Sequence, residues 1–326
     1  MRESLIEKLA EPSTGSPLRL QNGKSENGRI VSGELVSEST GVAYPIRDGI
    51  PTFVGGDTYA DSFGLQWNLF RDVQLDGDTG AARSRARFDA EAGWDEEALR
   101  GRWVLDAGCG AGRFAEIVAA RGANLVALDY SSAVHATAKT LARFPNVDVV
   151  RGSLLEPPFR RGTFDYAYCI GVVQHTPDPS AAVRNVVDVV RPGGSFCFTI
   201  YGRRPWTKLN AKYLLRPITK RLPQRVLLRA IEGVMPIAFP VTTRLFKLPV
   251  IGRAAQFAIP IANYVDHDDF TPAQKYSEAV LDTFDMLSPQ YDSPMTWNEV
   301  DSALRQVGVK NVEFRTQFPV NAVGVR

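Results

Sequence analysis

Residues 103–120 read WVLDAGCGAGRFAEIVAA, an apolar run followed by a glycine-rich turn and a second apolar pattern. The run at 103–105 predicts a buried strand, and the pattern at 114–120 predicts a helix. Because glycine has no side chain, a ligand can approach the backbone of such a turn closely. The turn glycines alternate along the chain: Gly108, Gly110 and Gly112. This order predicts a βα unit that binds a nucleotide-like ligand at its turn.

Two acidic residues flank the turn and narrow the choice of ligand. Asp106 precedes the glycines, and Asp129 ends the next apolar run, at 125–128. An acid at the tip of a second strand, about 20 residues past the glycines, suits hydrogen bonding to the hydroxyls of a ribose. The G-x-G-x-G spacing differs from the G-x-G-x-x-G pattern that seats a pyrophosphate. A carboxylate at Asp106 would repel a pyrophosphate and attract an ammonium group.

These residues resemble motif I of the class I S-adenosylmethionine-dependent methyltransferases, which commonly reads D-x-G-x-G-x-G. Later segments resemble, in order, the third strand with its adenine-side loop, the fourth strand, the loop after it, and the turn into the fifth strand: 147–155, 164–170, 171–175 and 191–200. The resemblance covers roughly residues 100–201. It implies S-adenosylmethionine as cofactor, S-adenosylhomocysteine as product, and no metal.

The resemblance also implies an α/β fold, a doubly wound and mostly parallel seven-stranded sheet with helices on both faces. Residues 57–201 and 271–326 are expected to form this core. Residues 202–270 interrupt the pattern and are expected to form a helical lid over the substrate. Residues 1–56 are expected to form a separate small β unit.

The family motifs imply a set of cofactor contacts. Asp106 and Asp129 would hold the ammonium and the ribose, and Ser153 with Leu154 would flank the adenine. The family usually has an acid after the glycine of this adenine-side loop, whereas Ser153 is a weaker acceptor. The other implied contacts lie in or near the turn and after the second and fourth strands: Gly108, Cys109, Gly110, Gly112, Tyr130 and Gly171.

A predicted helix before the core carries residues that would share one face: Tyr59, Phe63, Gln66 and Trp67. In related methyltransferases a helix here covers the cofactor, and aromatic faces beside a positive sulfonium gain cation–π energy. Tyr59, Gln66 and Trp67 are therefore expected cofactor contacts. The alternative is that the stripe packs on the core, as aromatic stripes usually do.

Residues 1–56 are rich in Gly, Ser, Thr and Asn, with strand-like pieces at 29–31, 33–36 and 42–46. The segment 44–54 resembles the end of the Trm112-like zinc-ribbon domain, which often precedes such methyltransferases. That domain holds zinc with paired cysteines, and residues 1–56 contain no cysteine. We expect a metal-free form of the domain, with a β-hairpin arm of other ancestry as the alternative.

The formal net charge is +2, but residues 203–253 hold twelve Lys or Arg and one acid, Glu232. A basic stripe repeats at every fourth residue: Lys208, Lys212, Arg216 and Lys220. It is interpreted as a solvated helix face, an attachment to anionic lipid or a lipid-linked substrate, an RNA-binding face, or a site for an anionic small substrate. RNA is least favoured of the macromolecular partners, because its recognition usually needs exposed stacking platforms.

Composition indicates the cellular setting. No run of apolar residues reaches the length of a membrane span, and the N-terminus lacks an apolar signal core. The cysteines lie in or beside predicted core strands, where a reduced thiol packs as a small hydrophobe: Cys109, Cys169 and Cys197. We expect a cytoplasmic protein, with peripheral contact at the inner membrane face through residues 203–253 as an added hypothesis.

His175 is the candidate general base and a candidate substrate contact. It follows the predicted fourth strand, at the carboxyl edge of the sheet where ligands bind, and an imidazole can accept a proton near neutral pH. The alternative is that His175 caps a turn. Tyr201 and Tyr291 are the other expected substrate contacts. The segment 266–269 suggests a metal or base-supporting cluster, but the start signal at Thr271-Pro272 favours helix capping.

The favoured function is methyl transfer to a small-molecule, glycan or lipid-linked metabolite, at oxygen. Where N-methylating enzymes often carry an Asn/Asp-Pro-Pro-Tyr/Phe motif, residues 170–173 read Ile-Gly-Val-Val. An RNA methyltransferase that uses the insertion and the N-terminal unit is the alternative enzyme. A non-catalytic cofactor-binding partner is the alternative outside catalysis, and the retained Asp106 and Asp129 count against loss of the cofactor.

Overall fold

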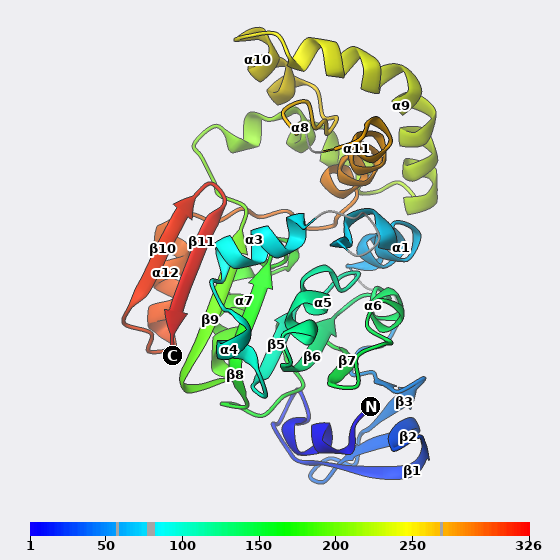
Figure 1. Cartoon of the computed structure of the whole chain (residues 1–326), viewed down its shortest axis with the longest axis vertical. Helices are drawn as coiled ribbons and strands as arrows, with labels where there is room; N and C mark the ends of the chain where they lie inside the picture. The colour runs from blue at the N-terminus through cyan, green and yellow to red at the C-terminus, as the bar shows by residue number, and fades with distance from the viewer. Residues whose placement is uncertain (57–58, 77–81, 268–269) are drawn as a thin grey trace.

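A seven-stranded sheet lies at the centre of the described chain, residues 1–56, 59–76, 82–267 and 270–326 (Figure 1). This computed structural model orders the strands β10-β11-β9-β8-β5-β6-β7. Strands β5 to β9 pair in parallel, and β11 pairs antiparallel with both β9 and β10. The bounds are β5 Trp103–Ala107, β6 Asn124–Asp129, β7 Val147–Arg151, β8 Phe164–Ile170, β9 Val190–Ile200, β10 Val312–Gln317 and β11 Val320–Val325. The mostly parallel sheet confirms the predicted fold class.

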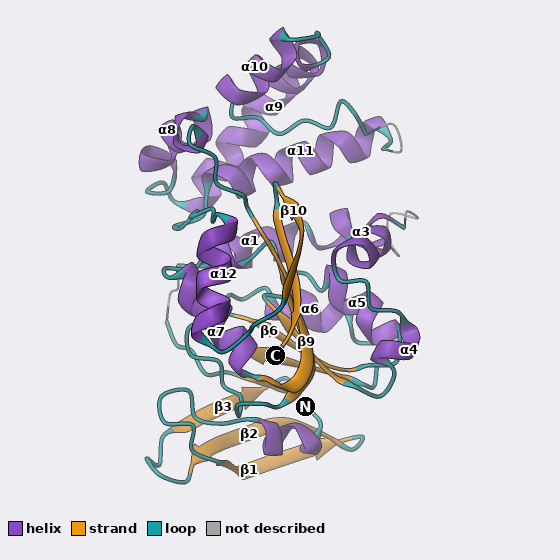
Figure 2. Cartoon of the chain, turned by 90° about the vertical axis from the view of Figure 1, so that its left-hand side faces the viewer, coloured by secondary structure: helices purple, strands orange, loops and turns teal. Residues whose placement is uncertain are grey.

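Helices cover both faces of the sheet, as a doubly wound fold requires (Figure 2). Helices α7 and α12 lie on one face, where Val183 and Leu304 share a core. Helices α3, α4 and α5 lie on the other, where Phe88 and Val118 share a second core. The bounds are α3 Arg83–Glu91, α4 Glu96–Leu99, α5 Arg113–Ala120, α6 Val134–Thr140, 3₁₀ helix η3 Val173–His175, α7 Pro179–Asp188 and α12 Trp297–Gln306.

The N-terminal residues form a separate four-stranded antiparallel sheet beside β7. The expected strands appear as β2 and β3, whereas β1 was not predicted because most of its side chains are polar and exposed. The buried carboxylate of Asp148, on β7, pairs with Arg2 at 2.7 Å and Arg29 at 3.1 Å. The bounds are η1 Glu3–Lys8, β1 Leu18–Glu26, β2 Arg29–Ser37, β3 Ala43–Arg47 and β4 Ile50–Pro51.

The helical insertion, residues 202–270, lies at the end of the molecule opposite the N-terminal sheet (Figure 1). It contains the helices η4 Thr207–Leu209, α8 Ala211–Thr219, α9 Gln224–Phe246 and α10 Ile251–Ala258. Helix α11, Pro272–Leu287, was expected with the core. Its Ala279 and Phe284 pack against Leu228 and Ile231 of α9 in a separate apolar cluster, and Leu65 and Phe70 pack against the same cluster. Helix α11 therefore contacts both the insertion and the segment that precedes the core.

The basic stripe expected on the surface of α8 is partly internal. Lys212 pairs with the buried carboxylate of Asp292 at 2.8 Å. The buried guanidinium of Arg216 donates to the carbonyl oxygens of Met286 and Pro289 at 3.1 and 2.8 Å. The interpretation as a solvated helix face therefore does not hold for Lys212 and Arg216, because polar partners distant in sequence hold them inside.

Helix α9 is long and apolar enough to cross a membrane by length and composition only, although the sequence has no uninterrupted apolar run of that length. It has 23 residues, and its most apolar window has a mean hydropathy of 1.4 with 28% of that window buried. Arg229 and Glu232 interrupt the apolar run in the sequence, yet the helix as a whole remains apolar. Length and composition of this kind are also found in helices of proteins that do not span a membrane.

Candidate functional site

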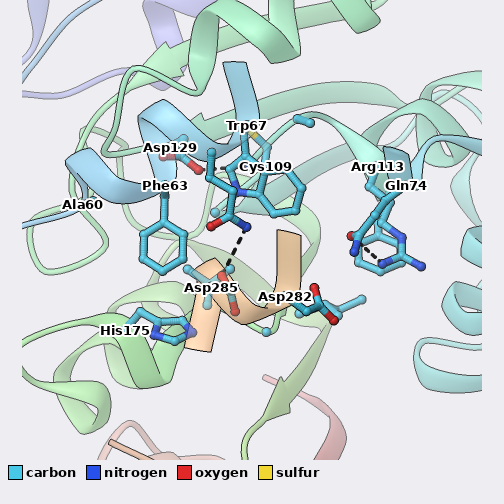
Figure 3. Close-up of a pocket in the computed structure, with 18 of the residues that line it drawn as sticks. Ala60, Phe63, Trp67, Gln74, Cys109, Arg113, Asp129, His175, Asp282 and Asp285 are labelled. Atoms are coloured by element: carbon cyan, nitrogen blue, oxygen red, sulfur yellow. Dashed lines mark hydrogen bonds between the residues drawn. The ribbon is translucent and has the colours of Figure 1, made fainter. Parts of the chain in front are cut away.

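A cavity of about 600 Å³ lies between the carboxyl ends of the parallel strands and two helices, α1 (Asp61–Leu69) and α11 (Figure 3). It is at the edge of the sheet where ligands bind in doubly wound folds. Most of the sequence-predicted site residues line it: Tyr59, Gln66, Trp67, Gly108, Cys109, Gly110, Asp129, Tyr130, Leu154, Gly171, His175 and Tyr201. The other four lie outside this lining: Asp106, Gly112, Ser153 and Tyr291.

The glycine turn after β5 has a conformation that other residues would strain. Gly108 and Gly110 have φ angles of +96° and +54°. A Cβ atom on Gly108 would lie 2.5 Å from a methyl of Val172, and one on Gly110 would lie 3.0 Å from the indole nitrogen of Trp67. Gly112, with φ +89°, forms the N-cap of α5. Bare backbone is thus required where the turn meets the cavity.

Asp129 holds its carboxylate at the cavity wall through three hydrogen bonds. Oδ2 accepts from the backbone N–H of Gly110 at 3.0 Å. Oδ1 accepts from the backbone N–H and the hydroxyl of Ser131 at 2.8 and 2.7 Å. Burial raises the pKa of Asp129, and these donors lower it. Two carboxylate oxygens offer about four acceptor positions, so the group can accept a further hydroxyl from a ligand.

Asp106 lies behind the turn and is only 3% exposed. Its Oδ2 atom has no hydrogen-bond partner among the described residues. Burial raises the pKa of Asp106 to about 8, while the neighbouring Tyr168 hydroxyl lowers it. A buried carboxyl oxygen without a partner is costly, and a ligand ammonium near the turn would satisfy it. The residue fits the ammonium role, although it does not itself line the cavity.

Phe63, Gln66 and Trp67 of α1 line the cavity, and Tyr59 lines it from the turn that precedes the helix (Figure 3). Tyr59 stacks on Tyr130 with ring centroids 4.7 Å apart. Gln66 is 1% exposed, and its Nε2 donates to Asp285 of α11 at 3.3 Å, while its Oε1 has no partner among the described residues. These residues therefore line the cavity and also pack against neighbouring side chains, while their contact with a cofactor stays a prediction.

His175 lies in η3 with 6% of its surface exposed and lines the cavity. Its Nδ1 lies 3.0 Å from the backbone carbonyl oxygen of Tyr291. Phe63 and Tyr201 flank the ring, with centroids 4.9 and 5.6 Å away. Tyr291, an expected substrate contact, therefore contacts His175 through its main-chain carbonyl, and its ring packs edge-on against Tyr59.

Three carboxylates of α11 that the sequence analysis missed line the cavity: Glu278, Asp282 and Asp285. Burial, together with Asp285, raises the pKa of Asp282 to about 7, and the hydroxyl of Tyr264 donates to Asp282. Glu278 accepts from Gln74 at 2.9 Å. The spacing of four and three residues places such acids on one helix face, and this periodicity was the available signal.

The remaining expectations concern the adenine-side loop and metals. The Ser153 hydroxyl accepts from the backbone N–H of Leu155 at 3.1 Å and does not line the cavity. Among the described residues, no group of three or more His, Cys, Asp or Glu is placed to hold a metal ion. Asp268 and Asp269 of the suggested cluster lie outside the described residues. Thr271 forms a capping box with Gln274 and confirms the predicted helix start.

Two family matches cover separate parts of the chain. Residues 105–198 match the family described as methyltransferase domain, and residues 3–49 match the family described as Trm112p-like protein. The first region contains most of β5 to β9 of the central sheet, and the second contains β1 to β3 of the N-terminal sheet.

Curated relatives match over the central part. The chain is 34% identical over 129 residues to the ubiquinone biosynthesis O-methyltransferase of Alkalilimnicola ehrlichii, covering 37% of this chain and 52% of the relative. It is 35% identical over 135 residues to that of Azotobacter vinelandii, covering 38% and 57%. The chain thus spans about half the length of these relatives.

Among solved structures, a putative S-adenosyl-L-methionine-dependent methyltransferase from Methanococcus maripaludis aligns with a TM-score of 0.45 and 12% identity. The alignment covers 84% of this chain and 96% of that one.

Proposed function

Because this chain carries a methyltransferase domain of the class I S-adenosylmethionine-dependent family behind a Trm112-like unit, we propose that it methylates an oxygen of a small-molecule, glycan or lipid-linked metabolite. The match of residues 105–198 to the family described as methyltransferase domain supports the family and the cofactor expected from the sequence. The relatives named as O-methyltransferases support oxygen as the accepting atom.

The observation that carries the proposal is the pair of carboxyl groups around one glycine turn. Asp129 is fixed at the cavity by the N–H of Gly110, and behind the same turn Asp106 Oδ2 has no hydrogen-bond partner in the part of the chain that the structure describes. The first suits a ribose diol, and the second suits an ammonium. We assign Tyr59 and Trp67 to the cofactor as well, since both line the cavity and Trp67 lies against Gly110 of this turn.

The acceptor side of the cavity is formed by α11 and the loop after β9. Asp282 and Asp285 line it together with Tyr201 and with Gln66, whose Nε2 donates to Asp285. These groups are mostly hydrogen-bond acceptors, so they favour an acceptor with several hydroxyl groups. Phe63 adds an apolar surface beside His175. The lining therefore suits a hydroxylated ring or sugar with apolar faces.

His175 is proposed as the base. The carbonyl of Tyr291 can only accept, so Nδ1 carries the proton and the lone pair lies on Nε2. S-adenosylmethionine supplies an already activated methyl group when bound. The protein needs to orient the acceptor, and His175 would take the hydroxyl proton onto Nε2. The α11 carboxylates would hold the acceptor's other hydroxyls.

The cellular setting is also proposed. We place the protein in the cytoplasm, with peripheral contact at the inner face of the membrane through the insertion. Supporting this, residues 203–253 keep a strong excess of basic side chains. Contact with the membrane would bring the protein to a lipid-linked acceptor.

Isothermal calorimetry with S-adenosylmethionine tests the cofactor site. Asp129→Ala is expected to weaken binding about tenfold or more, because charge-assisted hydrogen bonds to the ribose are lost. Asp301→Ala, on α12 outside the cavity, is the matched control. Absence of binding by the parent protein would refute the proposal.

A transfer assay with labelled cofactor on lipid, metabolite and RNA extracts tests the acceptor. Label in the lipid or metabolite fraction is the expected result. Label confined to RNA would replace the proposal with RNA methylation.

A further inference from the structure

Helix α9 has two apolar sides, of which one is covered. Leu228, Ile231 and Met235 are buried in the cluster with α11. At 3.6 residues per turn, another row points away from that cluster. Its members are 51%, 57%, 74% and 53% exposed: Val226, Val234, Ile237 and Val241. A row of exposed apolar side chains on the side of a helix away from its packing partner marks a candidate interaction site.

Helix α8 also exposes an apolar side, and its basic side chains face the interior of the protein. Lys212 and Arg216 point inward to Asp292 and to main-chain carbonyls. Its apolar side chains are exposed instead: Leu214, Leu215 and Ile218. Water alone would favour the opposite orientation of an amphipathic helix. The outer side of α8 therefore suits an apolar partner.

The link from α9 to α10 adds a third exposed apolar element at the same end of the molecule (Figure 1). Leu248, Val250 and Ile251 are exposed, Val250 by 84%. Exposed apolar side chains concentrated at one end of a molecule indicate an interaction site.

Charge identifies the kind of partner. The same segment exposes basic side chains among the apolar ones: Lys208, Arg221, Arg225, Arg229, Arg244, Lys247 and Arg253. Glu232 is the one acid among residues 203–253. A second copy of the chain would bring two such cationic faces together, which like charges disfavour. A surface of anionic lipid headgroups over acyl chains matches both the charge and the apolar side chains.

We infer that the outer sides of α8, α9 and the α9–α10 link dock on an anionic lipid bilayer. The exposed aliphatic side chains enter the headgroup layer, and the basic side chains contact lipid phosphates. Helix α9 lies along the surface, since its other side is packed on α11 within the protein. This inference deepens the proposed function and rests on it for the identity of the acceptor as a lipid-linked molecule. Helix α11 connects the two sites, since it packs against α9 and also lines the cavity with its carboxylates.

Vesicle flotation of the full chain tests the inference. Phosphatidylcholine vesicles are compared with vesicles that also contain phosphatidylglycerol, at low and high salt. The triple variant Val234→Ser, Ile237→Ser, Val241→Ser removes the exposed α9 row. Val42→Ser, exposed on the N-terminal unit, is the matched control. Thermal unfolding of each variant verifies that the fold is retained.

The expected result is partition onto the anionic vesicles that falls roughly tenfold or more in the triple variant and is unchanged in the control. No partition of the parent, or equal partition of parent and triple variant, overturns the inference. So does a dimer, seen by light scattering, that the triple variant dissolves, because the partner is then a second copy. Calorimetry with S-adenosylmethionine on the same samples separates failure of docking from failure of the proposed function.

Discussion

The Nδ1 atom of His175 lies 3.0 Å from the main-chain carbonyl oxygen of Tyr291. Because a carbonyl only accepts hydrogen bonds, the neutral ring is held with its proton on Nδ1 and its lone pair on Nε2. The next residue, Asp292, pairs with Lys212 of α8. The segment that contains Tyr291 and Asp292 therefore both sets the tautomer of His175 and anchors the insertion through Lys212.

Replacing His175 by Ala is expected to lower kcat by about 10²–10⁴-fold, the usual contribution of a general base. Binding of S-adenosylmethionine should change little, since Asp106 and Asp129 are kept. The measurement is steady-state transfer together with calorimetry, once an acceptor is known. His135→Ala, exposed on α6, is the control. An unchanged kcat would assign His175 a structural role only.

The sequence predicted the position of His175 but not its orientation. Its place after β8 follows from strand order, which apolar runs and glycine turns reveal locally. Its hydrogen-bond partner is 116 residues away in the chain. Such a contact depends on how α11 and the following loop pack, and no local pattern encodes that.

Asp106 predicts a pH dependence of cofactor binding. Burial raises its pKa to about 8, so the carboxyl of the free protein is mostly protonated at pH 6. A ligand ammonium requires the ionised form, and binding therefore releases a proton. Affinity should rise with pH, by up to about tenfold per unit below this pKa.

Calorimetry between about pH 6 and 8, within the range of the raised pKa, measures this slope. Asp106→Asn should bind more weakly and lose the slope. An equally steep slope in Asp106→Asn would show that another group takes up the proton.

Charge patterns on helices predicted the exposure of side chains least well. Lys212 and Arg216 looked like surface residues, because their spacing matches an amphipathic helix. Their partners are Asp292 and the carbonyls of Met286 and Pro289, which only the folded chain brings near. The cavity position of the α11 carboxylates could not be predicted from their spacing, since acids on a helix usually face solvent.

The Lys212–Asp292 pair predicts how firmly the insertion is anchored. The Asp292 side chain is 2% exposed and that of Lys212 is 16% exposed. Asp292→Asn leaves the ammonium without its counter-charge, and we expect a loss of about 1–3 kcal/mol in the free energy of unfolding. Acceptor KM should rise while cofactor affinity is unchanged.

Chemical unfolding and calorimetry of the same samples measure both effects. The double variant Lys212→Met, Asp292→Leu should recover part of the stability, since no charge is then left buried. Equal stability of Asp292→Asn and the parent would contradict an anchoring role.

Asp148 predicts that the N-terminal unit is docked through one carboxylate. Its side chain is fully buried and accepts from Arg2 at 2.7 Å and Arg29 at 3.1 Å. Asp148→Asn should reduce the free energy of unfolding by about 1–3 kcal/mol, because two guanidinium groups lose their shared partner. Limited proteolysis should then cut residues 1–56 faster than in the parent.

Glu34→Gln, exposed on β2, is the control for the Asp148 variant. Cofactor affinity should not change, since Asp148 does not line the cavity. Unaltered proteolysis would mean that the apolar contacts of Leu5 and Leu9 hold the unit in place without this carboxylate.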